Sequence, residues 1–396
     1  MPSLDLGPVV GPQGPQGVPG AQGQRGEQGL PGPNVVGGAT ATPLTGVLTG
    51  NGSVVGVANI DAVPTENSTG FAQSGGTYDA IKGKVPVFGM GKNLLDNWYF
   101  QNPVNQRGQS SYVGANSGYT IDRWRCGLGS GASLTIGVGT SGITLTKTGS
   151  SAGNFTQVIE TTRVLPGMKA TLSVLIDEIS VTSDVKPCLF IFTGTSGAYY
   201  HLASIAVDSV GPHSLTFTIP DLANYNTFMV GFGAATPAST QTAVYTARIR
   251  AIKLEFGTEQ TLAHQENGVW VLNEIQDYGE ELRKCQRYFV RYSQLHGYPM
   301  FAYGSANSAT VGAVTIPLPV SMRPIAPTVT FSGTIKLRHG SVIGASAPNV
   351  TSFQDVALYG NSLGLSAVVS GGLTIGENCF LQIRENTSYL DISCEP

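Results

Sequence analysis

Aromatic and polar side chains, found together in two parts of this 396-residue chain, carry its best candidate chemistry. Sugar rings stack their apolar faces on Trp, Tyr or Phe, and sugar hydroxyls bond to Asp, Asn, Gln and Arg. Both kinds of side chain cluster between residues 98 and 124, and aromatic residues return near residue 300. We therefore predict candidate glycan-binding residues at Trp98, Tyr99, Arg107, Asp122, Trp124, Tyr298, Phe301 and Tyr303.

The two tryptophans also admit a structural interpretation. Trp98 and Trp124 lie in the motifs that define the fold and not in variable loops, which favours their being core residues. Tyr298, Phe301 and Tyr303 lie in a loop-like stretch. Because loops on a rigid scaffold usually carry recognition, the last domain is the better candidate for a receptor site.

Catalytic chemistry has little support. The histidines are isolated, and the sequence contains no metal-binding His pair, nucleophile elbow or phosphate-binding loop. Asp122 is either one carboxylate of a sugar-cleaving pair or part of an ion pair packed in a strand beside Arg123 and Trp124. We expect a protein that is not an enzyme, with no metal site and no cofactor.

The charge and the cysteine content limit which partners and which cellular compartment we expect for this protein. Charged residues make up 12% of the chain and the formal net charge is -3, which disfavours nucleic acid as a partner. The start of the sequence lacks the pattern of a secretion signal, and no stretch is long and apolar enough to predict a membrane span. The five cysteines are widely spaced without a CxxC pair, as expected for buried thiols of a protein folded in a reducing cytoplasm.

Residues 11–34 repeat the triplet Gly-X-Y. Glycine stands at every third position, at Gly11, Gly14, Gly17, Gly20, Gly23, Gly26, Gly29 and Gly32. This spacing predicts a collagen-like triple helix, because only glycine fits at its crowded axis. The run predicts a homotrimer, but its rod of about 70 Å, at ~3 Å per residue, is too short to hold three chains alone.

The segments on either side of the repeat are candidates for docking to a larger particle and for trimer assembly. Residues 1–10 are predicted to be either a docking peptide for a larger particle or a frayed terminus, and docking would use the apolar residues Leu4, Leu6, Val9 and Val10. Residues 35–92 are low in charge, and we expect three copies to intertwine there as a trimeric connector. A short helix is predicted within this connector, ending before Gly83.

The rest of the chain reads as mainly β. In residues 93–260, apolar and polar residues alternate over 132–138, 142–147, 169–176, 213–219 and 244–254, which predicts a jelly-roll-like β-sandwich. Residues 261–290 are predicted to hold a linker and an amphipathic helix over 274–290, packed either on its own domain or as a threefold neck. Its apolar residues are Tyr278, Leu282, Cys285 and Phe289. Residues 291–396 predict a distal β-domain with strands at 313–317, 328–337, 380–383 and 389–392.

Five motifs carry a family resemblance, at residues 64–86 (PTENSTGFAQSGGTYDAIKGKVP), 93–108 (NLLDNWYFQNPVNQRG), 119–125 (YTIDRWR), 252–257 (IKLEFG) and 278–289 (YGEELRKCQRYF). In this order they resemble a widespread family of tail-fibre and related structural proteins of tailed bacteriophages and prophages. The resemblance covers roughly residues 60–290. It implies a trimeric fibre with a sandwich-like module.

Together these features predict a homotrimeric virion fibre, made in the bacterial cytoplasm, that attaches to a tail, baseplate or capsid protein through its N-terminus. Its C-terminal domains would bind a glycan or protein of the bacterial surface, with no membrane insertion. One alternative is a capsid (head) fibre that decorates the shell, and another is a depolymerase fibre that degrades capsule. A bacterial collagen-like surface adhesin is a weaker option, because export and anchoring signals are not evident.

Overall fold

The computed structural model describes residues 13–26, the backbone of four short strands between residues 48 and 72, and residues 91–396 except 117, 196–197, 236–240, 294–299 and 341–345. The chain divides into two compact units, Met1–Lys84 and Val85–Pro396. The predicted docking residues, the predicted connector helix, and Gly11, Gly29 and Gly32 lie outside the described residues.

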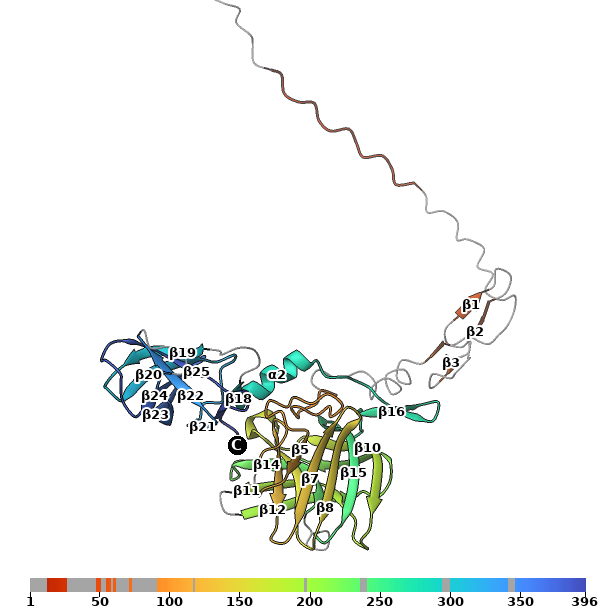
Figure 1. Cartoon of the computed structure of the whole chain (residues 1–396). Helices are drawn as coiled ribbons and strands as arrows, with labels where there is room; N and C mark the ends of the chain where they lie inside the picture. Colours follow the sequence, from red (N-terminus) through yellow and green to blue (C-terminus); the bar gives the residue numbers. More distant parts are fainter. Residues whose placement is uncertain are drawn as a thin grey trace, which may run out of the picture. The chain divides into compact units, whose positions relative to one another are not determined.

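The first unit contains two kinds of described segment. Residues 13–26 form an extended chain without helix or strand (Figure 1). All of these residues are exposed. Farther on, β1 (Leu48–Gly50) pairs antiparallel with β2 (Val55–Val57). β3 (Ile60–Asp61) pairs parallel with β4 (Phe71–Ala72). The described part of the triplet repeat is therefore fully exposed in the single chain.

The second unit begins with a sandwich of two antiparallel sheets (Figure 1). The six-stranded sheet has the order β13-β10-β15-β8-β7-β5. Its strands in chain order are β5 (Ser111–Val113), β7 (Ser133–Gly139), β8 (Gly142–Thr148), β10 (Lys169–Val181), β13 (Gly211–Thr218) and β15 (Tyr245–Phe256). The five-stranded sheet has the order β12-β11-β14-β9-β6. Its strands are β6 (Trp124–Leu128), β9 (Gly153–Ile159), β11 (Cys188–Thr195), β12 (Ala198–Ala206) and β14 (Thr227–Ala234).

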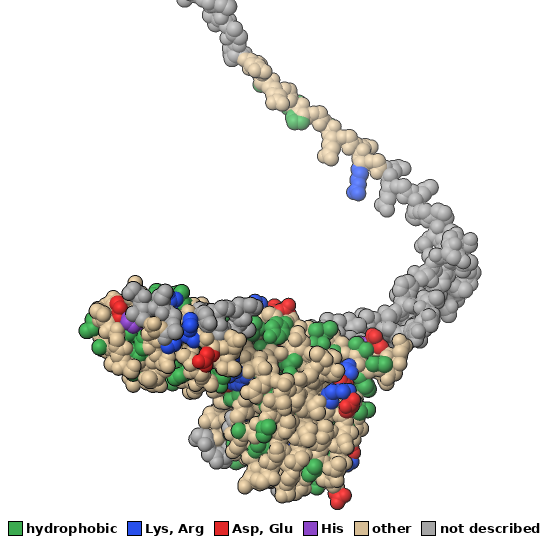
Figure 2. Space-filling view, in the orientation of Figure 1, with side chains coloured by type: hydrophobic (Ala, Val, Ile, Leu, Met, Phe, Trp, Pro, Cys, Tyr) green, Lys and Arg blue, Asp and Glu red, His purple; other side chains and the backbone are tan. Residues whose placement is uncertain are grey.

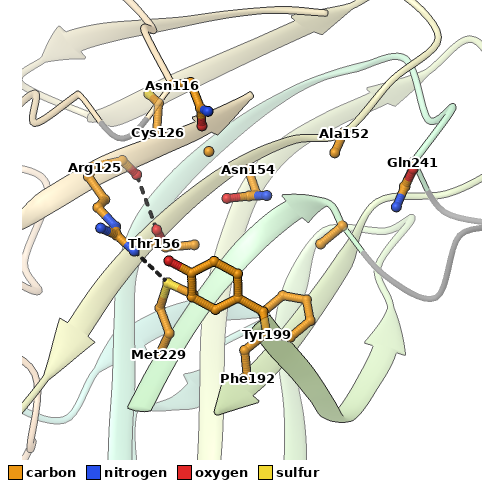
Figure 3. A pocket seen from close by; sticks show the side chains of 12 residues that line it. Asn116, Arg125, Cys126, Ala152, Asn154, Thr156, Phe192, Tyr199, Met229 and Gln241 are labelled. Atoms are coloured by element: carbon orange, nitrogen blue, oxygen red, sulfur yellow. Dashed lines mark hydrogen bonds between the residues drawn. The ribbon is translucent and has the colours of Figure 1, made fainter. Parts of the chain in front are cut away.

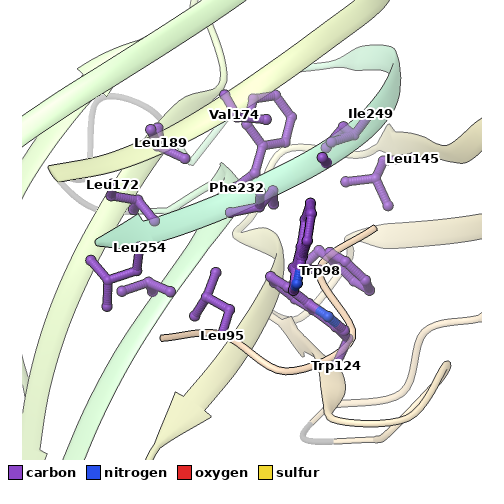
Figure 4. Packing of buried hydrophobic residues seen from close by; sticks show 14 of the residues in the cluster. Leu95, Trp98, Trp124, Leu145, Leu172, Val174, Leu189, Phe232, Ile249 and Leu254 are labelled. Carbon is purple, nitrogen blue, oxygen red and sulfur yellow. The ribbon is translucent and has the colours of Figure 1, made fainter. Parts of the chain in front are cut away.

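Large aromatic and aliphatic side chains fill the space between these sheets (Figure 4). Trp124 stacks on Phe155 with 4.8 Å between ring centroids, and Phe100 meets Trp124 edge-on at 5.3 Å. Leu172 of β10 lies opposite Leu254 of β15 in the register of the six-stranded sheet. The sandwich therefore has its own continuous core, as the alternating sequence pattern predicted.

The two sheets differ in their outer faces. β7 and β8 follow the alternation of inward apolar and outward polar residues, whereas β11 and β14 are buried on both sides for most of their length. In β11, Leu189 and Ile191 belong to the sandwich core while Phe190 and Phe192 belong to a second apolar cluster. Because successive strand residues point to opposite faces, this second cluster lies on the outer face of the five-stranded sheet.

A short linker leads from the sandwich to the distal strands. The η1 turn (Thr161–Arg163) lies within the sandwich sequence, and the linker contains β16 (Ala263–Glu266), β17 (Val269–Leu272) and α2 (Tyr278–Gln286). Asp277 caps α2 by accepting a hydrogen bond from the Glu280 backbone N–H. The side chain of Glu281 on α2 accepts a hydrogen bond from the Asn97 N–H at 2.7 Å. α2 therefore packs on the sandwich of its own chain, which was one of the two predicted arrangements.

The predicted helix over 274–290 was too long and its apolar stripe was partly wrong. α2 ends at Gln286, and Phe289 begins β18 (Phe289–Ser293). Cys285 and Phe289 are buried as predicted, but Tyr278 is 43% exposed. The buried face includes the charged Glu281, which bonds to backbone and therefore does not show in a hydrophobic pattern.

The distal strands form a second layered β-domain. A three-stranded sheet has the order β18-β26-β21, and a six-stranded sheet has the order β22-β25-β19-β20-β24-β23. The strands after β18 are β19 (Met300–Ala306), β20 (Val311–Pro317), β21 (Thr328–Ser332), β22 (Ile335–His339), β23 (Val350–Tyr359), β24 (Ser362–Val369), β25 (Asn378–Ile383) and β26 (Tyr389–Ser393). One strand predicted over 328–337 is two, because Gly333 takes a positive φ of 72° and turns the chain. Buried aliphatic residues from both sheets form one cluster.

These observations confirm the expectation of a mainly β chain. All five cysteines lie among the described residues, where they are buried and form no disulfide, as predicted. In the described part of the chain, no helix has the length and apolar character that crossing a membrane requires. The visible surface shows charges of both signs in small groups, with uncharged side chains between them (Figure 2).

Candidate functional site

The structure places Trp98 and Trp124 in the sandwich core. Their side chains are 4% and 0% exposed, and the Trp124 indole donates a hydrogen bond to the Asn97 carbonyl at 2.8 Å. Neither ring offers a face to a ligand, so their assignment as glycan-binding residues was wrong. The alternative interpretation, that they are core residues, is confirmed.

Arg107 and Asp122 lie at a buried junction between the sandwich and the last residues of the chain. The Arg107 guanidinium contacts Asp122 at 3.2 Å and Glu395 at 2.7 Å, and it lies 3.7 Å from the centroid of the Phe289 ring. Burial raises the pKa of Asp122 to about 6 and that of Glu395 to about 7, while Arg107 acts in the opposite direction. Arg107 and Asp122 are therefore bonded within the chain, and their assignment as glycan-binding residues was wrong. The sequence did not indicate that Glu395 is the second partner of Arg107.

The remaining predicted residues do not come together. Tyr99 is half-buried against the sandwich core, and Phe301 stacks on Tyr292 with 5.1 Å between centroids. Tyr303 is 59% exposed on β19 of the distal domain. Tyr298 lies outside the described residues. Tyr303 is thus available for binding, but it lines neither of the two cavities described below.

A groove that the sequence did not indicate lies on the outer face of the five-stranded sheet (Figure 3). Its cavity has a volume of about 240 Å³. The floor is apolar, with Phe192 and Met229 almost fully buried, and the polar groups stand around it. The lining residues are Asn116, Arg125, Cys126, Gly127, Ala152, Asn154, Thr156, Phe192, Tyr199, Met229, Ala235 and Gln241.

A glycine on β6 leaves space on the outer face of the five-stranded sheet. A Cβ added to Gly127 would lie 2.5 Å from Oδ1 of Asn154, so only glycine leaves the Asn154 amide in its place. The missing side chain at Gly127 on β6 therefore leaves room for the Asn154 amide in the groove.

The side chains around the groove come from different structural elements. Tyr199 lies on the edge strand β12 and is 59% exposed. The Lys147 ammonium donates to the Gln241 carbonyl at 2.9 Å, which fixes the backbone at the far side of the groove. The side chains of Asn154 and Gln241 make no hydrogen bond within the described chain, so their amides are open to a ligand.

A second cavity of about 430 Å³ adjoins the first. Arg125 and Tyr199 line both cavities, and the second one also reaches Arg323, Glu395 and Pro396 near the end of the chain. Arg323 pairs with Glu160 at 3.2 Å. The Tyr119 hydroxyl donates to the Pro396 carbonyl at 2.7 Å and holds this last residue against the sandwich. Together the two cavities give the groove room for more than one sugar ring.

The groove presents an exposed aromatic ring, free amides and a guanidinium above an apolar floor. These groups can stack on a sugar ring and bond to its hydroxyls. Within the described residues, no group of three or more His, Cys, Asp or Glu side chains is placed to hold a metal ion. The arrangement therefore fits binding. The signal available in the sequence was the unbroken apolar run through Phe190 and Phe192, which indicates a strand covered on both faces.

Comparisons with known proteins add little to this geometry. No family model matches the chain, and no curated protein matches it. One similar solved structure is described as "CBM4 structure and function", with 15% identity over 41% of this chain and 99% of that chain, at a TM-score of 0.25. Another is the N-terminal CBM22-1-CBM22-2 tandem domain of Paenibacillus barcinonensis Xyn10C, with 11% identity over 78% of this chain and 98% of that chain, at a TM-score of 0.27. At these TM-scores neither likeness supports a conclusion about this chain.

Proposed function

We propose that this chain is a homotrimeric fibre protein of tailed-bacteriophage type that binds a glycan of the bacterial surface through the groove on its five-stranded sheet. It acts by binding, without catalysis, and it is part of the virion. The groove replaces the distal aromatic residues as the leading candidate for the receptor site.

The observation that carries this proposal is the exposed Tyr199 ring beside free amides. A sugar ring stacked on Tyr199 would place its hydroxyls near the amides of Asn154 and Gln241, which have no partner within the described chain. Phe192 and Met229 beneath the ring would exclude water from the apolar face of the sugar. A binding groove of this kind needs no catalytic group.

The triplet repeat supports the trimeric part of the proposal. A Cβ added to Gly14, Gly17, Gly20, Gly23 or Gly26 meets nothing within 4 Å in the single chain. Glycine is therefore not required there by the chain alone, whereas a triple helix requires it at each of these positions. Three grooves on one fibre would gain avidity, because the second and third binding events become intramolecular.

The direct test measures binding of the full-length protein to an array of bacterial surface polysaccharides and to whole cells. We expect Tyr199→Ala to weaken binding about tenfold, since an aromatic contact contributes about 0.5–1.5 kcal/mol per site and three sites act together. Tyr200→Ala is the matched control, because Tyr200 is also exposed but packs edge-on against Tyr225 outside the groove. Equal losses in the two variants, or no binding by the parent protein, would refute the proposal.

Three further measurements separate the alternatives. Mass photometry should report a trimer. Antibody labelling of intact particles should mark the tail, whereas label over the head would favour a capsid fibre. Incubation with the bound polysaccharide should leave its chain length unchanged, and shortening would favour a depolymerase.

A further inference from the structure

The first cavity of the groove is lined by a cation without a matching anion. Arg125 is the one charged residue among the described residues that line the first cavity. Its guanidinium donates a hydrogen bond to the Met229 sulfur at 3.2 Å, and a thioether is a weak acceptor. No carboxylate within the described chain pairs with it.

Three other arginines of the same unit are each paired with a carboxylate. Arg123 contacts Asp96 at 3.2 Å, Arg107 contacts two carboxylates, and Arg323 contacts Glu160 at 3.2 Å. Each of these guanidiniums is compensated by an acidic side chain of the chain itself. Arg125 is also partly buried, beside the apolar Met229 and Phe192, yet it has only a sulfur atom as a partner.

A guanidinium without a carboxylate has unused donors in a fixed planar fork. That fork matches the two oxygens of a carboxylate or phosphate, and such bonds are shorter and stronger than bonds between neutral groups. In the groove, Arg125 lines the same cavity as Tyr199 and Asn154, so an anionic group and a sugar ring can bind side by side (Figure 3).

We propose that the ligand of the groove is an acidic saccharide, with its anionic oxygen group on Arg125 and its ring on Tyr199. This inference rests on the proposed glycan-binding function and specifies its ligand class. Uronic acids carry the required charge as a carboxylate, and phosphorylated sugars carry it as a phosphate. A neutral glycan would leave the guanidinium desolvated without compensation.

The experiment uses the full-length protein and an array of oligoglucuronate, oligogalacturonate and oligomannuronate. Each acid is printed beside its carboxyl-reduced, neutral counterpart, and a set of sugar 6-phosphates forms a third arm. We expect the acids or the phosphates to bind at least tenfold more tightly than the neutral forms, which corresponds to about 1.4 kcal/mol. The arm that binds identifies whether the anion is a carboxylate or a phosphate.

The variants then assign the effect to Arg125. Arg125→Gln should remove the preference for the acid, and Arg125→Lys should retain part of it, because lysine keeps the charge without the planar fork. Arg283→Gln, on the exposed side of α2, makes the same chemical change away from the groove and should have no effect. Unchanged tryptophan fluorescence would show that each variant is folded.

The outcomes are distinguishable. Equal or tighter binding of neutral forms would overturn the acidic ligand and leave glycan binding in place. Acid binding that is insensitive to Arg125→Gln would overturn the assignment to this residue. Absence of binding in every arm would count against both the acidic ligand and the proposed function.

Discussion

Replacing Arg107 with Met tests whether one cation holds two buried carboxyl groups at the junction between the sandwich and the end of the chain. The side chains of Asp122 and Glu395 are 0% and 3% exposed, and both contact Arg107. Methionine retains an apolar contact with Phe289 but leaves both carboxylates without the guanidinium. Removing one partner of a buried ion pair costs about 3–5 kcal/mol, so we expect a loss in this range near pH 8.

The loss should depend on pH in a definite direction. Burial raises the pKa of Asp122 to about 6 and that of Glu395 to about 7, above values of roughly 4 in an unfolded chain. The folded state therefore binds more protons than the unfolded state between about pH 4 and pH 7, and these groups make the free energy of unfolding fall as pH rises through that window. Without Arg107 both pKa values rise further. The cost of Arg107→Met should thus be larger at pH 8 than at pH 5, where both carboxyl groups are largely neutral.

Urea unfolding followed by tryptophan fluorescence measures this effect. The three tryptophans, Trp98, Trp124 and Trp270, all lie in the sandwich or in the linker beside it. Arg248→Met is the control, because Arg248 pairs with Glu178 at the surface, where such pairs contribute about 0–1 kcal/mol. A loss for Arg107→Met that is equal at pH 5 and pH 8, or no larger than that of the control, would refute the reasoning.

Two other variants test the core and the repeat. Trp124→Ala should lower the free energy of unfolding by about 3–5 kcal/mol, as loss of a large buried aromatic side chain does, and a loss below about 1 kcal/mol in urea would contradict the core assignment. Gly20→Ala should lower the melting temperature of the repeat and increase protease cleavage within residues 11–34 while tryptophan fluorescence stays native. Since its Cβ meets nothing within 4 Å in the single chain, unchanged cleavage would count against the triple helix.

The sequence predicted one sheet of the sandwich much better than the other. All five segments chosen for their alternation, among them those that became β10 and β15, lie in the six-stranded sheet. Alternation arises where one face of a strand meets the core and the other meets water. The strands β11 and β14 have apolar residues on both faces, so this signal is absent from the five-stranded sheet.

The candidate site was missed for the same physical reason. The groove depends on the covered outer face of the five-stranded sheet, where Phe192 and Met229 supply the floor. Its polar residues come from strands far apart in sequence, such as Asn154 on β9 and Tyr199 on β12. Only the assembly of the whole sheet, in which β11 and β14 lie between β12 and β9, brings these residues to one surface. Apart from Arg125, at the end of the motif at residues 119–125, no motif residue lines that cavity, and the tryptophans of the motifs lie in the core.

Three of the motifs that carry the family resemblance, at residues 93–108, 119–125 and 278–289, contact one another in the structure. Asn97 bonds to the Asp122 carbonyl at 2.7 Å, and the Arg123 guanidinium lies 3.5 Å from the centroid of the Tyr288 ring. Gln106 donates to the Phe289 carbonyl at 2.7 Å and so joins two motifs that lie far apart in sequence. These three motifs therefore form a structural support, and they do not by themselves indicate a ligand.

Arg125 connects this support to the groove. It is the last residue of the motif at residues 119–125, and it follows the fully buried Trp124 on β6. Because neighbouring strand residues point to opposite faces, packing Trp124 into the core directs Arg125 outward, to the side of the sheet where Tyr199 lies. The remaining groove residues lie outside the motifs, on the later part of β6, on β9, β11, β12 and β14, and in the loops beside them. A chain with the same motifs could therefore keep this guanidinium and change its ligand by substitutions on β9, β12 and β14 alone.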